Sequence, residues 1–262
     1  ITNPIEVISQ LTYLMFMRSL DEREFEAESM EAVLGVPQKH IFPETYRNAY
    51  GVEIPGSEMR WSRFKDKASE EMYRIVDQFV FPFIKDMGGD SAFSKAMEGA
   101  TFGFPAGKTS LLEKAVDGVE ELLVGFEDNI GDLGDLYEYM LSKLSTAGTN
   151  GQFRTPKHIR DMMVAMIDPK PGEFICDPAC GTAGFLISSA EHIRGNYEAS
   201  MSEADWNCFT GANGALPQFT GFEMDQTMLR ISTMNLMLHG AEAPDVRYLD
   251  SISKNNTVRG QY

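Results

Sequence analysis

The chain has 262 residues, of which 43% are hydrophobic and 24% charged, a composition that fits a folded protein with a sizeable core. No apolar run reaches the roughly 18 residues that a membrane-spanning helix needs, so we expect no membrane span. The net charge is −16, and residues 1–150 carry −12 of it. Because an acidic chain repels phosphate, a nucleic-acid function would need a local basic patch or a partner subunit that supplies positive charge.

The cysteines are few and odd in number, namely Cys176, Cys180 and Cys208. This usage indicates a reducing compartment, hence a cytoplasmic protein, and no disulfide framework. Cys176 and Cys180 could be pictured as metal ligands, but no histidine lies near them in the sequence and no second cysteine pair exists. We therefore predict no metal site.

The N-terminal part has the pattern of a helical domain. Asn3 suits an N-cap and Pro4 a first helical position, and apolar residues then recur at helical spacing as far as about Leu20. The helix should enter the acidic stretch 21–31, whose charges we expect on a solvated face. Residues 35–60 are rich in glycine and proline and predict a long loop.

Three more helices are expected in this part, over 69–86 with Ser69 as its cap, over 111–124 and over 133–144. No alternating strand pattern occurs before residue 170. We therefore assign residues 1–145 to an all-helical N-terminal domain and residues 146–262 to a second domain.

In the second domain, strands alternate with helices, which predicts a parallel sheet with right-handed crossovers. The expected helices cover 156–167, 184–194 and 226–239. The expected strands cover 174–176, 218–223 and 246–249. The segment 195–217 looks like an insertion.

The stretch from Phe174 to Leu186 predicts a strand, a glycine turn and a helix. Ligands of open α/β sheets bind at the carboxyl ends of the strands. Gly181 and Gly184 would allow a ligand to approach the backbone, and the helix N-terminus favours an anionic group. Asp177 could accept from an ammonium group, so the methionyl part of S-adenosylmethionine matches both features.

Two further acidic residues stand at the ends of the next strands. Glu223 could accept both ribose hydroxyls of a nucleoside, and Asp250 could contact an adenine amino group. The alternative interpretation is that all three carboxylates are ordinary polar residues at strand ends and that the glycines only make turns. Their occurrence at three successive strand ends favours a nucleoside-type ligand.

The sequence Asp177-Pro-Ala-Cys-Gly-Thr-Ala-Gly-Phe-Leu186 resembles motif I of the N6-adenine DNA methyltransferases, most closely that of the HsdM family. Gly151-Gln-Phe-Arg-Thr-Pro-Lys157 resembles the motif X of this family, and the resemblance extends over about residues 125–250. It implies an α/β protein in which an all-helical N-terminal domain precedes a Rossmann-like S-adenosylmethionine-dependent methyltransferase domain, incomplete at its C-terminus. Together with Asp177 and Asp250, the implied cofactor contacts are Gln152, Phe153, Arg154, Thr155, Pro156, Lys157, Gly181, Thr182, Ala183 and Glu223.

The resemblance also implies a function, which is methyl transfer from S-adenosylmethionine to adenine N6 in duplex DNA, with the target base flipped out of the stack. The implied partners are DNA, a specificity subunit that reads the site and a restriction subunit, with two modification subunits per specificity subunit and no membrane. The Asn/Asp-Pro-Pro-Phe/Tyr catalytic motif of the family does not occur before Tyr262. We therefore expect no catalytic residue within these 262 residues, and an isolated chain that binds cofactor without methylating DNA.

Other functions remain open at this point. A methyltransferase acting on RNA or on a protein glutamine would share the cofactor pocket, and a non-catalytic scaffold could retain it as a binding module. A nicotinamide dehydrogenase fits less well, because no Gly-x-Gly-x-x-Gly follows the first strand. The segment from Gly103 to Thr109 is similar to a phosphate-binding loop, but it has three residues between the first glycine and the Gly-Lys pair where that motif has four. We therefore expect an ordinary loop there.

Overall fold

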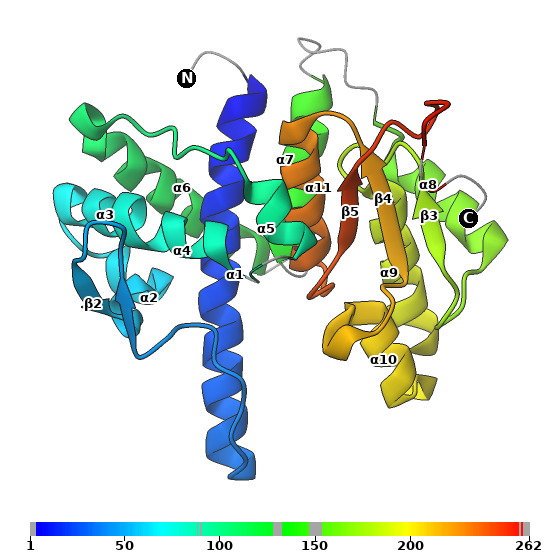
Figure 1. Ribbon diagram of the computed structural model, residues 1–262, viewed down its shortest axis with the longest axis horizontal. Helices are drawn as coiled ribbons and strands as arrows, with labels where there is room; N and C mark the ends of the chain where they lie inside the picture. The colour runs from blue at the N-terminus through cyan, green and yellow to red at the C-terminus, as the bar shows by residue number, and fades with distance from the viewer. Residues whose placement is uncertain are drawn as a thin grey trace. The chain divides into compact units, whose positions relative to one another are not determined.

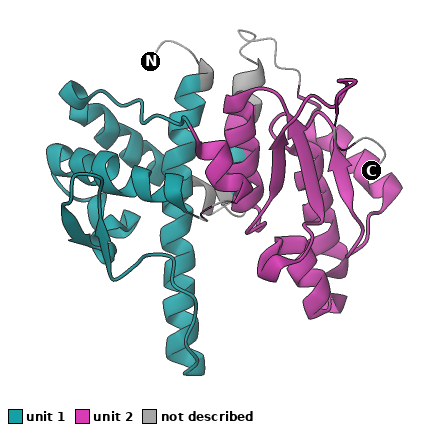
Figure 2. Cartoon of the chain, viewed as in Figure 1, with its two compact units in different colours: residues 1–87, 99–137 teal, residues 88–98, 138–262 magenta. Residues whose placement is uncertain are grey.

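The structure is a computed structural model that describes residues 4–87, 89, 91–127, 133–146, 154–256 and 258. It divides into two compact units, residues 1–87 with 99–137 and residues 88–98 with 138–262 (Figure 2). The division falls within helix α7 (Leu133–Thr146), between Tyr137 and Glu138. In the described part of the chain, no helix has the length and apolarity that a membrane span requires.

Unit 1 is built around helix α1 (Pro4–Leu34), the long blue helix of Figure 1. The five consecutive side chains from Tyr13 to Met17 are all buried. The other regular elements of this unit are β1 (Thr45–Arg47), β2 (Glu53–Pro55), α2 (Trp61–Phe64), α3 (Ser69–Ile75), α4 (Phe81–Asp86), α6 (Thr109–Glu127) and the first residues of α7.

One part of unit 1 is not helical, which corrects the expectation of an all-helical domain. In the segment expected to be a loop, β1 pairs antiparallel with β2 and places Tyr46 opposite Ile54. The Asn48 side chain accepts hydrogen bonds from the amides of Tyr50 and Val52, which closes the connection. Three-residue strands are too short to produce a recognisable alternation, and for this reason the sequence pattern missed them.

The helix expected over 69–86 forms, but it is not regular. A π-helical turn (Val76–Val80) separates α3 from α4. Pro82 has no N–H with which to bond the carbonyl four residues earlier, and the widened turn lies immediately ahead of it. Ser69 is the first helical residue and not the cap, a position that Ala68 occupies without a side-chain hydrogen bond. The expected helices over 111–124 and 133–144 are confirmed as parts of α6 and α7.

The acidic stretch 21–31 continues α1 as expected, but two of its carboxylates are buried, which corrects the prediction of a solvated face. Asp21 accepts from the Arg60 guanidinium at 2.5 Å and from the Ser62 amide at 2.7 Å. Glu24 accepts from the amides of Ile41 and, at a longer distance, Phe42. These partners lie far along the chain, so a charge count alone could not identify them.

Asp21 should make the stability of unit 1 depend on acid pH. Burial alone would raise the pKa of this carboxyl, but hydrogen bonds from Arg60 and Ser62 outweigh burial and hold the pKa below the ordinary value of 3.8. As the pH falls below about 4, the unfolded chain therefore takes up a proton before the folded chain does, and the stabilisation by ionised Asp21 is lost.

We expect Asp21→Asn to lower the unfolding free energy of unit 1 at pH 7 by about 1.5–3 kcal/mol, the usual contribution of hydrogen bonds to charged groups. The loss of stability between pH 5 and about pH 3, the range around the aspartate pKa, should also be shallower in this variant than in the wild type. Thermal unfolding followed by circular dichroism across this range tests both expectations. Glu26→Gln, a change in an exposed carboxylate of the same helix, is the control and should behave as the wild type does.

Unit 2 contains a three-stranded parallel sheet in the order β3-β4-β5, which confirms the predicted α/β class and its parallel strands. Cys176 pairs with Thr220, and Gly221 pairs with Val246. The strands are β3 (Ile175–Asp177), β4 (Phe219–Glu223) and β5 (Asp245–Tyr248), and the α-helices beside the end of α7 are α5 (Ala92–Met97), α8 (Lys157–Ile167), α9 (Gly184–Tyr197), α10 (Glu203–Thr210) and α11 (Gln226–Leu238).

The central strand and the helices around it form the core of unit 2. Four of the five residues of β4 are buried, as a strand covered on both faces requires. One apolar cluster joins all three strands to α5, α9, α10 and α11, and it includes Leu186, Phe219 and Leu229. The segment read as an insertion contributes to this cluster, because it folds into α10 and places Phe209 edge-on to Phe219.

Candidate functional site

The turn between β3 and α9 lies at the carboxyl end of the sheet. The Cys180 amide donates to the carbonyl of Phe222 at 3.0 Å, which fastens the turn to the neighbouring strand β4. Gly221 makes this approach possible, since a side chain there would lie 2.8 Å from the Cys180 sulfur. Gly181 has φ +55° and open space around the position of a side chain, so the backbone at this residue is accessible to a ligand.

Two of the predicted site residues, Asp177 and Glu223, converge on this turn. One Glu223 oxygen, Oε2, accepts from the Gly181 amide at 3.0 Å, and the other accepts from the amides of Met224 and Asp225. Burial raises the pKa of Asp177, a bond from the Ala179 amide opposes the rise, and the charge of Glu223 adds to it. A positively charged group between the two carboxylates would relieve both the desolvation and the repulsion.

Asp250 lies at the same edge of the sheet, two residues beyond the end of β5. The Leu249 amide donates to the Glu223 carbonyl at 3.2 Å and keeps this segment beside the end of β4. The Asp250 carboxylate accepts from the Ile252 amide at 3.1 Å and thereby closes its own turn. The three strand ends thus carry the three carboxylates that the sequence pattern singled out.

The segment ahead of α8 reaches the turn through Arg154. The Arg154 Nε atom donates to the Thr182 hydroxyl at 3.0 Å, and its Nη2 atom donates to both oxygens of Glu138 at 2.8 Å. The Thr155 carbonyl faces the Arg160 guanidinium at 3.4 Å, and Pro156 is the N-cap of α8. Gln152 and Phe153 lie outside the described residues.

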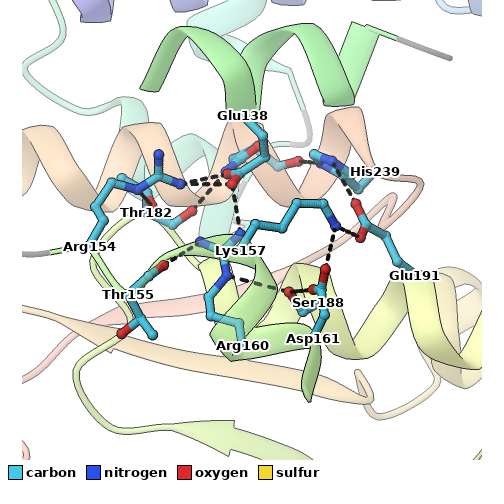
Figure 3. A network of polar contacts seen from close by, with 11 residues as sticks. Glu138, Arg154, Thr155, Lys157, Arg160, Asp161, Thr182, Ser188, Glu191 and His239 are labelled. Carbon is cyan, nitrogen blue, oxygen red and sulfur yellow. Dashed lines mark hydrogen bonds and ion pairs between the residues drawn. The ribbon is translucent and has the colours of Figure 1, made fainter. Parts of the chain in front are cut away.

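Lys157 and Ala183 have different surroundings from the rest of the predicted set. The Lys157 ammonium bonds Glu191 on α9 at 2.5 Å and Asp161 at 3.3 Å (Figure 3). Ala183 is fully buried and has φ +66°, so it can offer only its backbone, and it stands at the N-cap position of α9.

Glu138, on α7, is at the centre of a buried polar network (Figure 3). Besides Arg154, it accepts from Arg160 Nη2 at 2.9 Å and from the Asn235 side-chain amide at 2.9 Å. Burial alone would raise the pKa of Glu138, but the charges of Arg154 and Arg160, with these hydrogen bonds, lower it. The carboxylate is therefore ionised at neutral pH and paired with two guanidinium groups.

Arg160 also explains why residue 184 is a glycine. A side chain at Gly184 would begin 2.4 Å from Arg160 Nη1 and 2.9 Å from the guanidinium carbon. The close approach at this position is therefore made by a buried arginine of the same unit, whereas the sequence had suggested that a ligand makes it. At Gly181, by contrast, a side chain would meet nothing within 4 Å, so this position remains open to a ligand.

An apolar hollow of about 310 Å³ lies beside this site, between α8, β3 and α9. It touches Asp177 and Pro178 but does not extend to Glu223, so we define the candidate site by the convergence of polar groups and not by this hollow. Burial and the charges of Asp177 and Glu223 raise the pKa of the Cys180 thiol to about 12, which makes it an unreactive packing residue. The described residues contain no group of three or more His, Cys, Asp or Glu side chains arranged to hold a metal ion.

Comparison with known proteins assigns the chain to a family. Residues 128–260, just over half of the chain, match the family model of the N-6 DNA methylases. The chain belongs to the N-6 DNA methylase family. Residues 1–119 match the model of the HsdM N-terminal domain, which agrees with the resemblance seen in the sequence. Methylases of this family imply a methyl donor of the S-adenosylmethionine type.

Curated proteins similar to this chain include the methylase subunits of several type I restriction enzymes. That of the type I restriction enzyme EcoEI from Escherichia coli is 28% identical over 253 residues, which cover 94% of this chain and 47% of the relative. The methylase subunit of MjaIX from Methanocaldococcus jannaschii is 26% identical over 262 aligned residues. This alignment covers 91% of this chain and 42% of the relative. The chain therefore spans about half the length of the curated relatives it matches.

A solved structure supports the fold of this N-6 DNA methylase family member. The modification subunit of a putative type I restriction enzyme from Vibrio vulnificus superposes with a TM-score of 0.61 at 21% identity, over 96% of this chain and 52% of that one. The similarity spans both units of the chain.

Sequence reasoning missed three residues of the site, namely Glu138, Arg160 and Asn235. Arg160 lies on α8 and is buried, whereas Met163 and Met166 of the same helix are exposed. A charged residue within an apolar stretch is a weak signal by itself. It becomes informative only when a buried partner of opposite charge is known, and Glu138 lies 22 residues earlier.

Proposed function

We propose that this chain binds S-adenosylmethionine at the carboxyl edge of the β3-β4-β5 sheet and serves methyl transfer to adenine N6 in duplex DNA. The observation that carries the proposal is the convergence of Asp177 and Glu223 on the glycine turn in a member of the N-6 DNA methylase family. We place the cofactor site within residues 146–262 and propose that residues 1–145 form the N-terminal domain of the subunit.

The donor set fits this cofactor chemically. Asp177 would accept from the α-ammonium group, and the charged sulfonium would lie in the field of two carboxylates. Glu223 already accepts three backbone hydrogen bonds, and a carboxylate offers about four lone-pair positions. One position therefore remains for a ribose hydroxyl, and a second hydroxyl would have to displace one backbone amide. We place Asp250 near the adenine amino group.

The segment ahead of α8 would close the methionyl end of the site. We propose contacts there from Gln152, Phe153 and the backbone of 154–157, and from Gly181, Thr182 and Ala183 of the turn. When bound, the cofactor supplies an activated methyl group on a positively charged sulfur. The residues of this chain orient it and balance its charge.

The relatives suggest the wider context. They are named as methylase subunits of type I restriction enzymes. We therefore propose that this chain is a modification subunit that assembles with specificity and restriction subunits in the cytoplasm. The proposed complex contains two modification subunits for each specificity subunit. A partner that supplies positive charge agrees with the net charge of −16. The family match favours DNA over RNA or a protein glutamine as the substrate.

Calorimetric titration with S-adenosylmethionine tests the site. We expect saturable binding by the wild type, and binding at least about tenfold weaker for Asp177→Asn and for Glu223→Ala, because each loses a charged hydrogen bond of about 1.5–3 kcal/mol. Glu242→Gln is the matched control, since it removes an exposed carboxylate of the same unit.

Titrations with different ligands and assays with different substrates distinguish the proposed function from the alternatives. A folded wild type that binds no S-adenosylmethionine would support a scaffold, and binding of NAD instead would support a dehydrogenase. Methyl transfer to duplex DNA, RNA and protein by the assembled complex, followed with tritiated cofactor, should label adenine in DNA alone. Label in RNA or protein would contradict the proposed substrate.

A further inference from the structure

The buried carboxylate of Glu138 has two routes to a single residue of the turn. Through Arg154 it reaches the Thr182 hydroxyl, which accepts from Arg154 Nε at 3.0 Å. Through Asn235 it reaches the Thr182 carbonyl, which accepts from the Asn235 side-chain amide at 2.8 Å. The Asn235 nitrogen thus bridges Glu138 and Thr182, and both polar ends of Thr182 are held by partners of one carboxylate.

A third route reaches the start of α9. Arg160 donates to Glu138 at 2.9 Å, its guanidinium lies against Gly184, and its Nε atom faces the Ser188 hydroxyl at 3.4 Å (Figure 3). Ser188 in turn donates to Asp161 on α8 at 2.8 Å. One carboxylate therefore connects α7, the segment ahead of α8, the glycine turn and helices α9 and α11.

Burial makes this arrangement costly, which argues for a specific role. The side chains of Glu138, Arg154 and Arg160 are 8%, 12% and 4% exposed, so three charges have lost most of their hydration. Buried ion pairs often add little net stability compared with apolar residues of the same size. What such a network does provide is a fixed geometry, because each partner satisfies the carboxylate only from one direction.

We infer that Glu138 is a positioning residue for the cofactor turn. It fixes the position of Thr182 through Arg154 and Asn235. It fixes the position of Gly184 through Arg160, and it does not contact the ligand itself. This inference rests on the proposed function, since the turn is the proposed cofactor site. Asn235 is fully buried, so its side chain cannot contact the ligand directly.

The test uses Glu138→Gln and Asn235→Leu, with Met234→Ala as the control. Met234 is fully buried on the same helix as Asn235 and lies outside the polar network, so its truncation measures the effect of general destabilisation. At a temperature where all three variants are folded, both network variants should bind S-adenosylmethionine about tenfold more weakly than the wild type, the scale of one lost hydrogen bond. Met234→Ala should bind within twofold of the wild type.

Hydrogen exchange of the cofactor-free protein supplies a readout independent of binding. Amides 181–184 should exchange about tenfold faster in both network variants and at the wild-type rate in Met234→Ala. Unchanged exchange in Asn235→Leu overturns the inference whatever the titration shows, and it remains decisive if Glu138→Gln does not fold. A wild type that fails to bind the cofactor while exchange responds as expected refutes the proposed function and leaves the positioning role of Glu138 in place.

Discussion

Replacing Gly184 with alanine should lower the free energy of unfolding of unit 2 by about 3 kcal/mol or more. The new methyl group would lie 2.4 Å from Arg160 Nη1. Arg160 cannot move aside freely, because its guanidinium is buried and bonded to Glu138. Overpacking costs about 1–3 kcal/mol, and separating a buried ion pair costs about 3–5 kcal/mol. Denaturant unfolding followed by circular dichroism measures the loss.

Gly195→Ala is the control for this prediction. Gly195 belongs to the same helix, and a side chain there would meet nothing within 4 Å. An exposed helical glycine changed to alanine should leave stability unchanged or raise it by about 0.5–1 kcal/mol.

A second background isolates the cause of the Gly184 effect. In an Arg160→Met protein the guanidinium is gone, and Glu138 keeps its two bonds from Arg154. Gly184→Ala should therefore cost much less in this background than in the wild type, a coupling that a double-mutant cycle measures directly. Equal costs in both backgrounds would show that the alanine acts through the turn backbone and not through Arg160.

Most strands and helices of unit 2 could be predicted from the sequence, because each is identified by the pattern of its own residues. Strand and helix periods identify β3, α9, β4, α11 and β5 one at a time, and parallel pairing then brings consecutive strand ends together. The approach of Glu223 to Gly181, 42 residues apart, follows from this geometry. The candidate site at the glycine turn could therefore be predicted from the sequence alone.

The charged network could not be found in the same way. Arg160 is buried because Glu138 neutralises it, and Glu138 is buried because Arg154, Arg160 and Asn235 satisfy it. Each of these side chains can be buried only because the others satisfy its charge or its hydrogen bonds. No helical or strand periodicity in the sequence relates their positions. Asp21 in unit 1 is a similar case, since Arg60 lies 39 residues away in a segment that had been read as loop.

Among the described glycines of unit 1, Gly56 leaves the least room for a side chain, and it yields the last prediction. Gly56, directly after β2, is buried, and a side chain there would begin 1.8 Å from the carbonyl oxygen of Pro43 and 2.9 Å from its carbonyl carbon. Both atoms belong to the backbone, and the Gly56 amide donates to the Glu44 carbonyl at 3.0 Å, so neither chain segment can move without losing that bond.

We therefore expect Gly56→Ala to destabilise unit 1 by about 3 kcal/mol or more, the upper end for overpacking, and to lower its melting temperature by roughly 6–12 °C. Gly118→Ala in α6 is the matched control, since a side chain there meets nothing within 4 Å and should cost nothing. Hydrogen exchange followed by mass spectrometry assigns the effect to its unit, because amides of α1 and α6 should lose protection while those of α9 and α11 keep it. Loss of protection in both units to the same degree would show that they unfold as one, in which case the Gly56 and Gly184 variants should lower a single shared transition.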